Sequence, residues 1–163
     1  MSTQANAAGW KPARIFLPTD GSDYAAGAIA VATEMARRCG APVRLMTSLP
    51  LGSDLETVGT QNLQAIETDK AQAQLDTLAS RLTAAGITCD TEVRHDEHPD
   101  AGIVDGAAAA GADLIVMGRR GKRGLARLMV GHATAKVIGN APCDVLVVPR
   151  AAQFWTRRIL LAT

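Results

Sequence analysis

Aromatic residues, net charge and long apolar runs are all scarce in this sequence. Two Trp, one Tyr and two Phe occur among 163 residues, so a core must be assembled from Ala, Val, Leu and Ile. That mixture suits helices packed closely on a sheet. Lys and Arg exceed Asp and Glu by only one. The chain as a whole therefore has no electrostatic attraction to nucleic acid or to an anionic membrane surface.

Targeting and membrane-spanning signals are not found either. Residues 1–14 lack the basic and then apolar order of a secretory signal, and no apolar run approaches the ~18–20 residues that cross a bilayer. We therefore expect a cytoplasmic protein with no membrane partner. The length fits one domain of ordinary size. We place this domain at 14–150, between an N-terminal extension at 1–13 and a C-terminal strand at 151–163.

Cysteine is limited to three residues, Cys39, Cys89 and Cys143. Their number is odd, they lie far apart, and each is embedded in a helix-like or strand-like apolar pattern. We therefore expect buried, reduced thiols in preference to a disulfide or a metal cluster.

A candidate metal-ligand set occurs at 95–100, HDEHPD, which holds His95 and His98 with three carboxylates. A polar loop beside an edge strand needs no metal, and we favour that explanation over a zinc site. No Ser/His/Asp or Cys/His set can be assembled from the sequence, and no G-x-S-x-G elbow occurs. We therefore expect a protein that is not an enzyme.

Apolar runs of strand length alternate with stretches of helical period from residue 14 to residue 149. Near-continuous Val, Leu and Ile runs indicate strands covered on both faces, which predicts a parallel sheet in a three-layer α/β/α domain. The alternation at 87–94 leaves one polar face and predicts an edge strand. We expect strands at 14–18, 43–49, 87–94, 113–117 and 144–149, and helices at about 25–39, 71–85, 99–110 and after Gly131, with Ser22 as the first N-cap.

A glycine-rich loop, GRRGKRGLARLMVGH at 118–132, follows the fourth predicted strand and carries five cations. Parallel α/β sheets bind ligands beyond the carboxyl ends of their strands, where the strand order reverses. Gly118, Gly121 and Gly131 would allow positive φ angles and the close approach of an anion. The start of the following helix also favours negative charge. Asp20, in the loop after the first strand, should flank the same place.

Simpler roles remain open for these residues. The glycine loop could merely connect a strand to a helix, and Asp20 could cap the first helix or hold its turn. Arg123 and Arg127 could form only a solvated face, and His132 could be an ordinary surface residue. The loop is neither a Walker A motif nor a GxGxxG dinucleotide turn.

The two ends of the domain resemble the universal stress protein family. RIFLPTDGSDYAAGAIA, from residue 14, looks like that family's first strand and helix, and DLIVMGRRGKRGLARLMVGHATAKVIGNAPCDVLVVP, at 113–149, looks like its closing half. The resemblance implies a five-stranded parallel sheet of order 3-2-1-4-5, similar to the adenine nucleotide alpha hydrolase fold. It also implies a homodimer joined through the last strand and, in one branch, a site for ATP or AMP, with or without Mg²⁺.

The resemblance also implies which residues form the nucleotide site. Asp20 matches the acidic position near the adenosine, Ser48 lies where the backbone at the end of the second strand meets the base, and the three glycines match the phosphate loop. The chain departs from the pattern at His132, where the nucleotide-binding branch has Ser or Thr. The implied site residues are Pro18, Asp20, Ser48, Met117, Gly118, Arg120, Gly121, Gly131, His132 and Ala133.

The C-terminal residues repeat the start of the domain. WKPARIFLPT at 10–19 aligns with FWTRRILLAT at 154–163, and the two stretches share Arg, Ile, Leu and Thr at matching positions. Either 151–163 begins a second copy of the domain, or it is an unrelated C-terminal strand.

Our leading hypothesis is a non-enzymatic, adenine-nucleotide-binding regulatory module of the stress response. A nucleotide-free dimerisation domain of the same fold is the alternative. An adenylyl-transferring enzyme is disfavoured, because TDGSD at 19–23 lacks the paired glycines of the Ser-Gly-Gly-x-Asp-Ser motif of the PP-loop group. The sequence does not name the protein partner, the stress signal or the preferred nucleotide.

Overall fold

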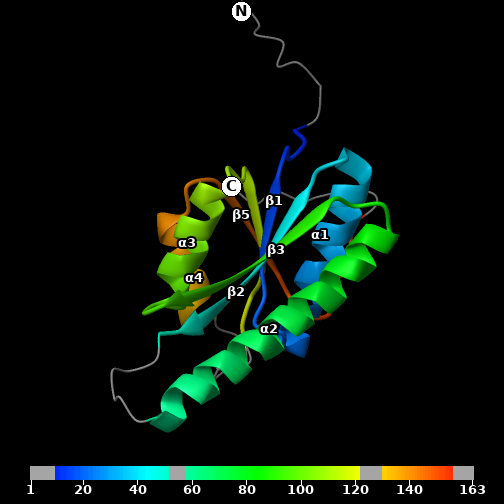
Figure 1. Ribbon diagram of the computed structural model, residues 1–163. Coiled ribbons are helices and arrows are strands. Elements are labelled where there is room, and N and C mark those ends of the chain that lie inside the picture. The colour runs from blue at the N-terminus through cyan, green and yellow to red at the C-terminus, as the bar shows by residue number, and fades with distance from the viewer. Residues whose placement is uncertain (1–9, 52–57, 122–129, 156–163) are drawn as a thin grey trace, which may run out of the picture.

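A parallel β-sheet forms the centre of the protein (Figure 1). The computed structural model describes residues 10–51, 58–121 and 130–155. Within these residues, five parallel strands follow the order β3-β2-β1-β4-β5, which confirms the order 3-2-1-4-5. Their bounds are β1 Ile15–Pro18, β2 Val43–Pro50, β3 Cys89–Asp96, β4 Leu114–Gly118 and β5 Asp144–Val148.

Helices cover both faces of the sheet and give the three expected layers (Figure 1). Helices α1 and α2 pack on one face, and α3 and α4 pack on the other. Ile15 and Leu17 of β1 are buried beneath the first pair, and Phe16 is buried beneath the second. None of the described helices is long and apolar enough to cross a membrane. The helix bounds are α1 Ala26–Cys39, α2 Val58–Ala84, α3 Pro99–Ala109 and α4 His132–Asn140.

Strand β3 lies at one edge of the sheet, as the alternation at 87–94 predicts. Its side chain Val93 packs on the core beneath α2. On the opposite face, the guanidinium of Arg44 from β2 lies 2.7 Å from Asp90 and 3.1 Å from Glu92. Charged side chains along an edge strand oppose edge-to-edge association with other sheets.

The first helix begins differently from the expectation. Ser22 makes no side-chain capping bond, and the chain passes through a 3₁₀ turn, Asp23–Ala25, before α1 begins at Ala26. Its hydroxyl is turned toward the preceding loop instead, because Ser22 Oγ donates to Asp20 Oδ1 at 2.5 Å. The predicted N-cap at Ser22 is therefore wrong as a side-chain cap of α1.

The cysteines are free thiols, but they are half-buried rather than buried. Each lies at the boundary of an element: Cys39 ends α1, Cys89 begins β3, and Cys143 precedes β5. Packing is less complete at such boundaries than in the middle of a strand or helix. The expectation of buried thiols was therefore correct about pairing and wrong about depth.

After β5 the chain crosses back over α1. A Cβ on Gly27 would lie 2.0 Å from the carbonyl oxygen of Pro149, so only glycine permits this approach. Further along, Phe154 packs against the core, with the guanidinium of Arg38 4.6 Å from its ring centre. The apparent repeat in 156–163 lies outside the described residues.

Replacing Gly27 with Ala should destabilise the fold by about 1–3 kcal/mol, the usual cost of overpacking. The new Cβ would meet a backbone carbonyl, so the segment after β5 has to move away from α1. Gly139→Ala in α4 is the matched control, because nothing lies within 4 Å of a Cβ there, and Ala favours a helix by about 1 kcal/mol. Urea unfolding followed by circular dichroism measures both. Equal changes in the two variants would contradict the role given to Gly27.

Candidate functional site

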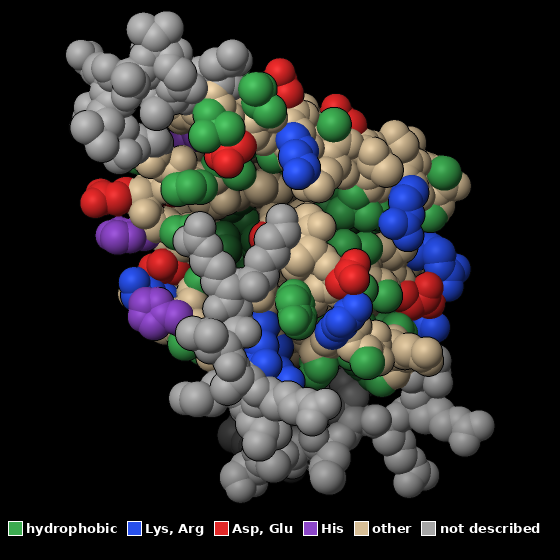
Figure 2. All heavy atoms as spheres, turned by 90° about the horizontal axis from the view of Figure 1, so that it is seen from below, with side chains coloured by type: hydrophobic (Ala, Val, Ile, Leu, Met, Phe, Trp, Pro, Cys, Tyr) green, Lys and Arg blue, Asp and Glu red, His purple; other side chains and the backbone are tan. Residues whose placement is uncertain are grey.

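The candidate residues gather at the carboxyl ends of the strands. Figure 2 views this end and shows hydrophobic side chains set back in a hollow, with side chains of both charges near it. The strand order reverses between β1 and β4, because the chain leaves β1 for β2 on one side and later places β4 on the other. A crevice for ligands is expected at such a reversal.

Asp20 holds the turn that follows β1. Its Oδ1 accepts a hydrogen bond from the backbone N–H of Ser22 at 3.0 Å and another from the hydroxyl of the same residue. Gly21 adopts a φ of 68°, which favours glycine, and its N–H donates to Thr19 Oγ1 at 3.1 Å. The simpler role considered for Asp20, holding its turn, is confirmed. This turn fixes the direction in which the carboxylate points.

The loops after β1 and β4 touch at Gly121. A Cβ on Gly121 would lie 2.6 Å from Asp20 Oδ2, and one on Gly118 would lie 3.1 Å from two backbone carbonyl oxygens. The positive φ angles predicted for Gly118, Gly121 and Gly131 are wrong, because none of the three has one. At Gly118 and Gly121 the missing Cβ, and not a special backbone conformation, is what the crowded loops require.

Backbone hydrogen bonds fix both ends of the loop after β4. The N–H of Arg119 donates to the carbonyl of Val148 at 3.0 Å, and the carbonyl of Arg119 accepts from the N–H of Gly131 at 2.9 Å. Thr134, which is 3% exposed, donates from Oγ1 to the carbonyl of Gly118 at 3.2 Å. The start of α4 is thereby held beside the end of β4.

His132 is exposed as the first residue of α4, after the extended residue Gly131. The first backbone N–H groups of a helix lack intrahelical acceptors, so this helix start offers donors and positive potential to an anion. Ala133 is half-buried in the same turn, and Arg119 and Arg120 are half-buried in the loop before it. The remaining cations of the loop, Lys122, Arg123 and Arg127, lie outside the described residues.

The end of β2 supports the loop that carries Asp20. Thr47 is 7% exposed, and its Oγ1 donates to the carbonyl of Thr19 at 2.9 Å. In turn, the N–H of Thr19 donates to the carbonyl of Met46 at 2.8 Å. Pro18 and Met117 are buried at the ends of β1 and β4, so they lie beneath the loops and not at the surface.

Ser48 is half-buried next to Thr47, and its Oγ donates to Asp96 Oδ2 at 2.9 Å. Arg94 Nε donates to the other oxygen of Asp96 at 3.4 Å. Sequence patterns placed Asp96 only in the candidate metal-ligand set at 95–100, and they did not identify Thr47 or Thr134. The one signal available in the sequence is a polar residue at the end of an apolar run.

The candidate metal ligands at 95–100 are divided between two faces of the sheet. His95 lies against α2, with Nδ1 3.2 Å from Gln64 Nε2 and Nε2 3.1 Å from Thr68 Oγ1. Asp96 lies on the opposite face, because successive strand residues alternate. Among the residues that the structure describes, no three His, Cys, Asp or Glu side chains could hold a metal ion together.

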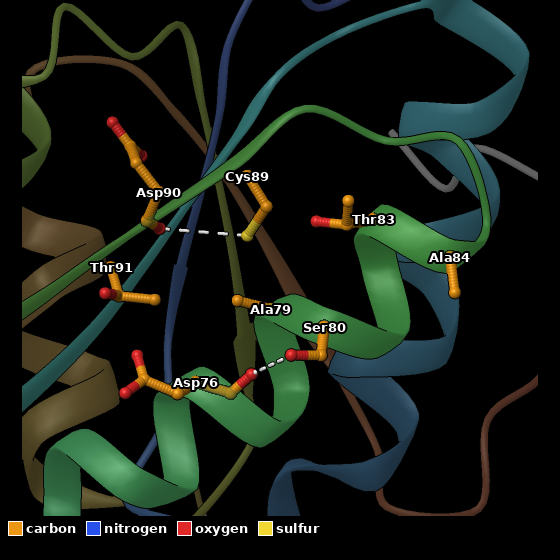
Figure 3. A pocket seen from close by; sticks show the side chains of 8 residues that line it. All are labelled: Asp76, Ala79, Ser80, Thr83, Ala84, Cys89, Asp90 and Thr91. Carbon is orange, nitrogen blue, oxygen red and sulfur yellow. Dashed lines mark hydrogen bonds between the residues drawn. The ribbon is translucent and has the colours of Figure 1, made fainter.

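A shallow groove lies between α2 and β3 at the opposite end of the sheet (Figure 3). Cys89 donates from Sγ to the carbonyl of Asp90 at 3.7 Å, and burial raises the pKa of Cys89 to about 11. The thiol is therefore protonated and weakly nucleophilic at neutral pH. The groove is lined by Asp76, Ala79, Ser80, Thr83, Ala84, Cys89, Asp90 and Thr91.

The fold and its loops define an α/β domain whose strand order reverses between β1 and β4. The model of the universal stress protein family matches residues 12–149. The chain belongs to the universal stress protein family, as the two resembling stretches predict.

Relatives of this family extend along most of the chain. A universal stress protein of Methanocaldococcus jannaschii is 33% identical over 140 residues, which cover 84% of this chain and 82% of the relative. A universal stress protein of Thermus aquaticus is 31% identical over 140 residues, which cover 82% of this chain and 96% of the relative.

Solved structures share the fold. UspA from Lactobacillus plantarum matches with a TM-score of 0.74 and 25% identity, covering 83% of this chain and 97% of its own. A universal stress protein of Archaeoglobus fulgidus in complex with dAMP has a TM-score of 0.61 and 26% identity, over 83% and 96%. Another universal stress protein, in complex with cAMP, has a TM-score of 0.66 and 24% identity, and the match covers 87% of this chain and 100% of the other. These likenesses confirm the fold class.

Replacing Thr134 with Val should cost about 1–2 kcal/mol of unfolding free energy, because the carbonyl of Gly118 loses its buried donor while the shape changes little. Thr77→Val is the matched control: its Oγ1 donates to the carbonyl of Ala73 on an exposed helix surface, so its loss should cost below about 0.5 kcal/mol. Denaturant unfolding measures both. If Thr134→Val is no more costly than the control, Thr134 does not fix the loop.

Proposed function

We propose that this protein binds an adenine nucleotide, ATP or AMP, at the carboxyl ends of its strands and acts as a non-enzymatic regulatory module in the cytoplasmic stress response. The observation that carries the proposal is the contact between Asp20 and Gly121, which joins the loops of β1 and β4 at the strand-order reversal. The complexes of related proteins with dAMP and cAMP give further support.

Donors at the start of α4 favour one orientation of the nucleotide. The phosphates would lie over the loop after β4, where helix N–H groups face the crevice. The side beyond β5 is filled, because Pro149 lies against Gly27 and Arg150 pairs with Asp23 at 3.1 Å. The base would extend the other way, across β1 toward the end of β2, about 10 Å from β4 at ordinary strand spacing.

A regulatory role fits the chemistry of this end of the sheet better than catalysis does. The side chains of Asp20, Ser48 and Thr134 each form a hydrogen bond to another group of the protein. Nucleotide binding would order the loops, and a partner protein would recognise the ordered form. The nucleotide would not be turned over.

Calorimetry with AMP and with ATP, with and without Mg²⁺, tests the nucleotide site. Gly121→Val should weaken binding by about tenfold or more, because a Cβ at this position displaces the Asp20 carboxylate. Gly139→Val is the matched control, since a Cβ there meets nothing. If Gly121→Val binds with unchanged affinity, the loop after β4 only connects β4 to α4 and does not form the nucleotide site. If wild-type protein neither binds nor copurifies with nucleotide, the nucleotide-free dimerisation domain is the better description.

His132 should donate to phosphate in place of the hydroxyl expected from the family pattern. The affinity for AMP should therefore fall in His132→Ala, which removes the donor, and should be largely kept in His132→Ser, which supplies a hydroxyl in its place. Calorimetry with AMP measures all three proteins. Equal affinity in the wild type and His132→Ala would remove His132 from the phosphate site.

We also propose that two copies associate through β5 or the C-terminal strand, because an open sheet edge seeks a partner. Val145 and Val147 of β5 are half-buried at this edge. Light scattering should give the mass of two chains at micromolar concentration, and deletion of 151–163 should weaken the dimer if that segment takes part. A monomer at high micromolar concentration, unchanged by the deletion, would contradict the proposal.

A further inference from the structure

Asp96 fixes the hydroxyl of Ser48 at the end of β2. Ser48 Oγ donates to Asp96 Oδ2 at 2.9 Å. The carboxylate is itself held in place, because Arg94 Nε donates to Oδ1 at 3.4 Å, and the carboxylate rests on Gly102 of α3, where a Cβ would lie 2.0 Å from Oδ2. The side chain of Asp96 is only 13% exposed. The acceptor of the Ser48 proton is therefore anchored on three sides.

This arrangement determines what Ser48 can offer to a ligand. A hydroxyl has one proton and two lone pairs, and an ionised carboxylate only accepts. With its proton directed to Asp96, Ser48 Oγ has only lone pairs left. Its neighbour Thr47 is likewise committed, because its proton goes to the carbonyl of Thr19. At the end of β2, Ser48 therefore presents an acceptor and no hydroxyl donor, whereas Thr47 lies buried on the opposite face of the sheet.

We propose that Asp96 is a positioning residue that makes Ser48 a hydrogen-bond acceptor and thereby selects 6-aminopurine over 6-oxopurine nucleotides. The inference rests on the proposed nucleotide site, with the base directed toward β2. Adenine carries an amino donor at its 6-position, which Ser48 Oγ can accept. Guanine and hypoxanthine carry an oxygen there, so two acceptors would face each other. A site built to pair with a donor rejects an analogue that lacks one, since its buried polar group is then left unpaired.

Comparison of AMP with IMP tests the selection directly, because the two nucleotides differ in the base at the 6-position. Calorimetry of the wild-type protein should give a dissociation constant for IMP at least about tenfold above that for AMP. Asp96→Asn should lower this ratio, because an amide can donate to Ser48 Oγ and leave the serine proton directed at the base. Ser48→Ala should lower the ratio as well, since it removes the acceptor.

Asp90→Asn is the matched control, because Asp90 accepts from Arg44 at the far end of the same strand. The ratio of the dissociation constants for IMP and AMP should be the same in this variant as in the wild type. Equal binding of AMP and IMP by the wild-type protein would overturn the inference and leave the nucleotide site standing. A wild-type ratio in Asp96→Asn, with the variant folded by circular dichroism, would overturn the role of Asp96. Binding of neither nucleotide by the wild type would overturn the proposed function together with the inference.

Discussion

The close approach of Asp20 to Gly121 is the constraint on which the candidate site depends. Oδ1 is occupied by both donors of Ser22, which points Oδ2 at the backbone of Gly121, within 2.6 Å of a Cβ position. The two loops leave neighbouring strands on either side of the strand-order reversal, so this one contact closes the floor of the crevice. A side chain at Gly121 would have to push the carboxylate out of the turn that it holds.

The layers of the fold and the edge position of β3 were predictable because each follows from burial, whereas the strand order was implied by the family resemblance. Strands β1 and β4 are apolar at consecutive positions, since helices cover both of their faces, whereas β3 alternates because it lies at an edge. The start of α1 was not predictable in the same way. Ser22 is a good N-cap by residue type, but its hydroxyl is turned toward the carboxylate two residues earlier, and α1 is preceded by a 3₁₀ turn.

The candidate site was found from glycine spacing, although the physical reason first given for the glycines was wrong. A positive φ is a local property, and neither Gly118 nor Gly121 has one. Crowding by another loop depends instead on residues that are far away in the chain. The same limit explains why sequence patterns connected Asp96 with a candidate metal set and not with Ser48. Its contact with Ser48 joins residues 48 positions apart, and only the register of β2 with β3 brings the two strand ends together.

Hydroxyl protons divide the crevice into two chemically different sides. Ser48, at the end of β2, directs its proton to Asp96 and keeps lone pairs, so that side favours a ligand's donors. On the β4 side, Thr134 also directs its proton inward, but the free N–H groups at the start of α4 supply donors that favour an anion. A nucleotide with an amino group at one end and phosphate at the other matches both sides in one orientation only. The same groups that fasten the loops therefore also set the polarity of the site.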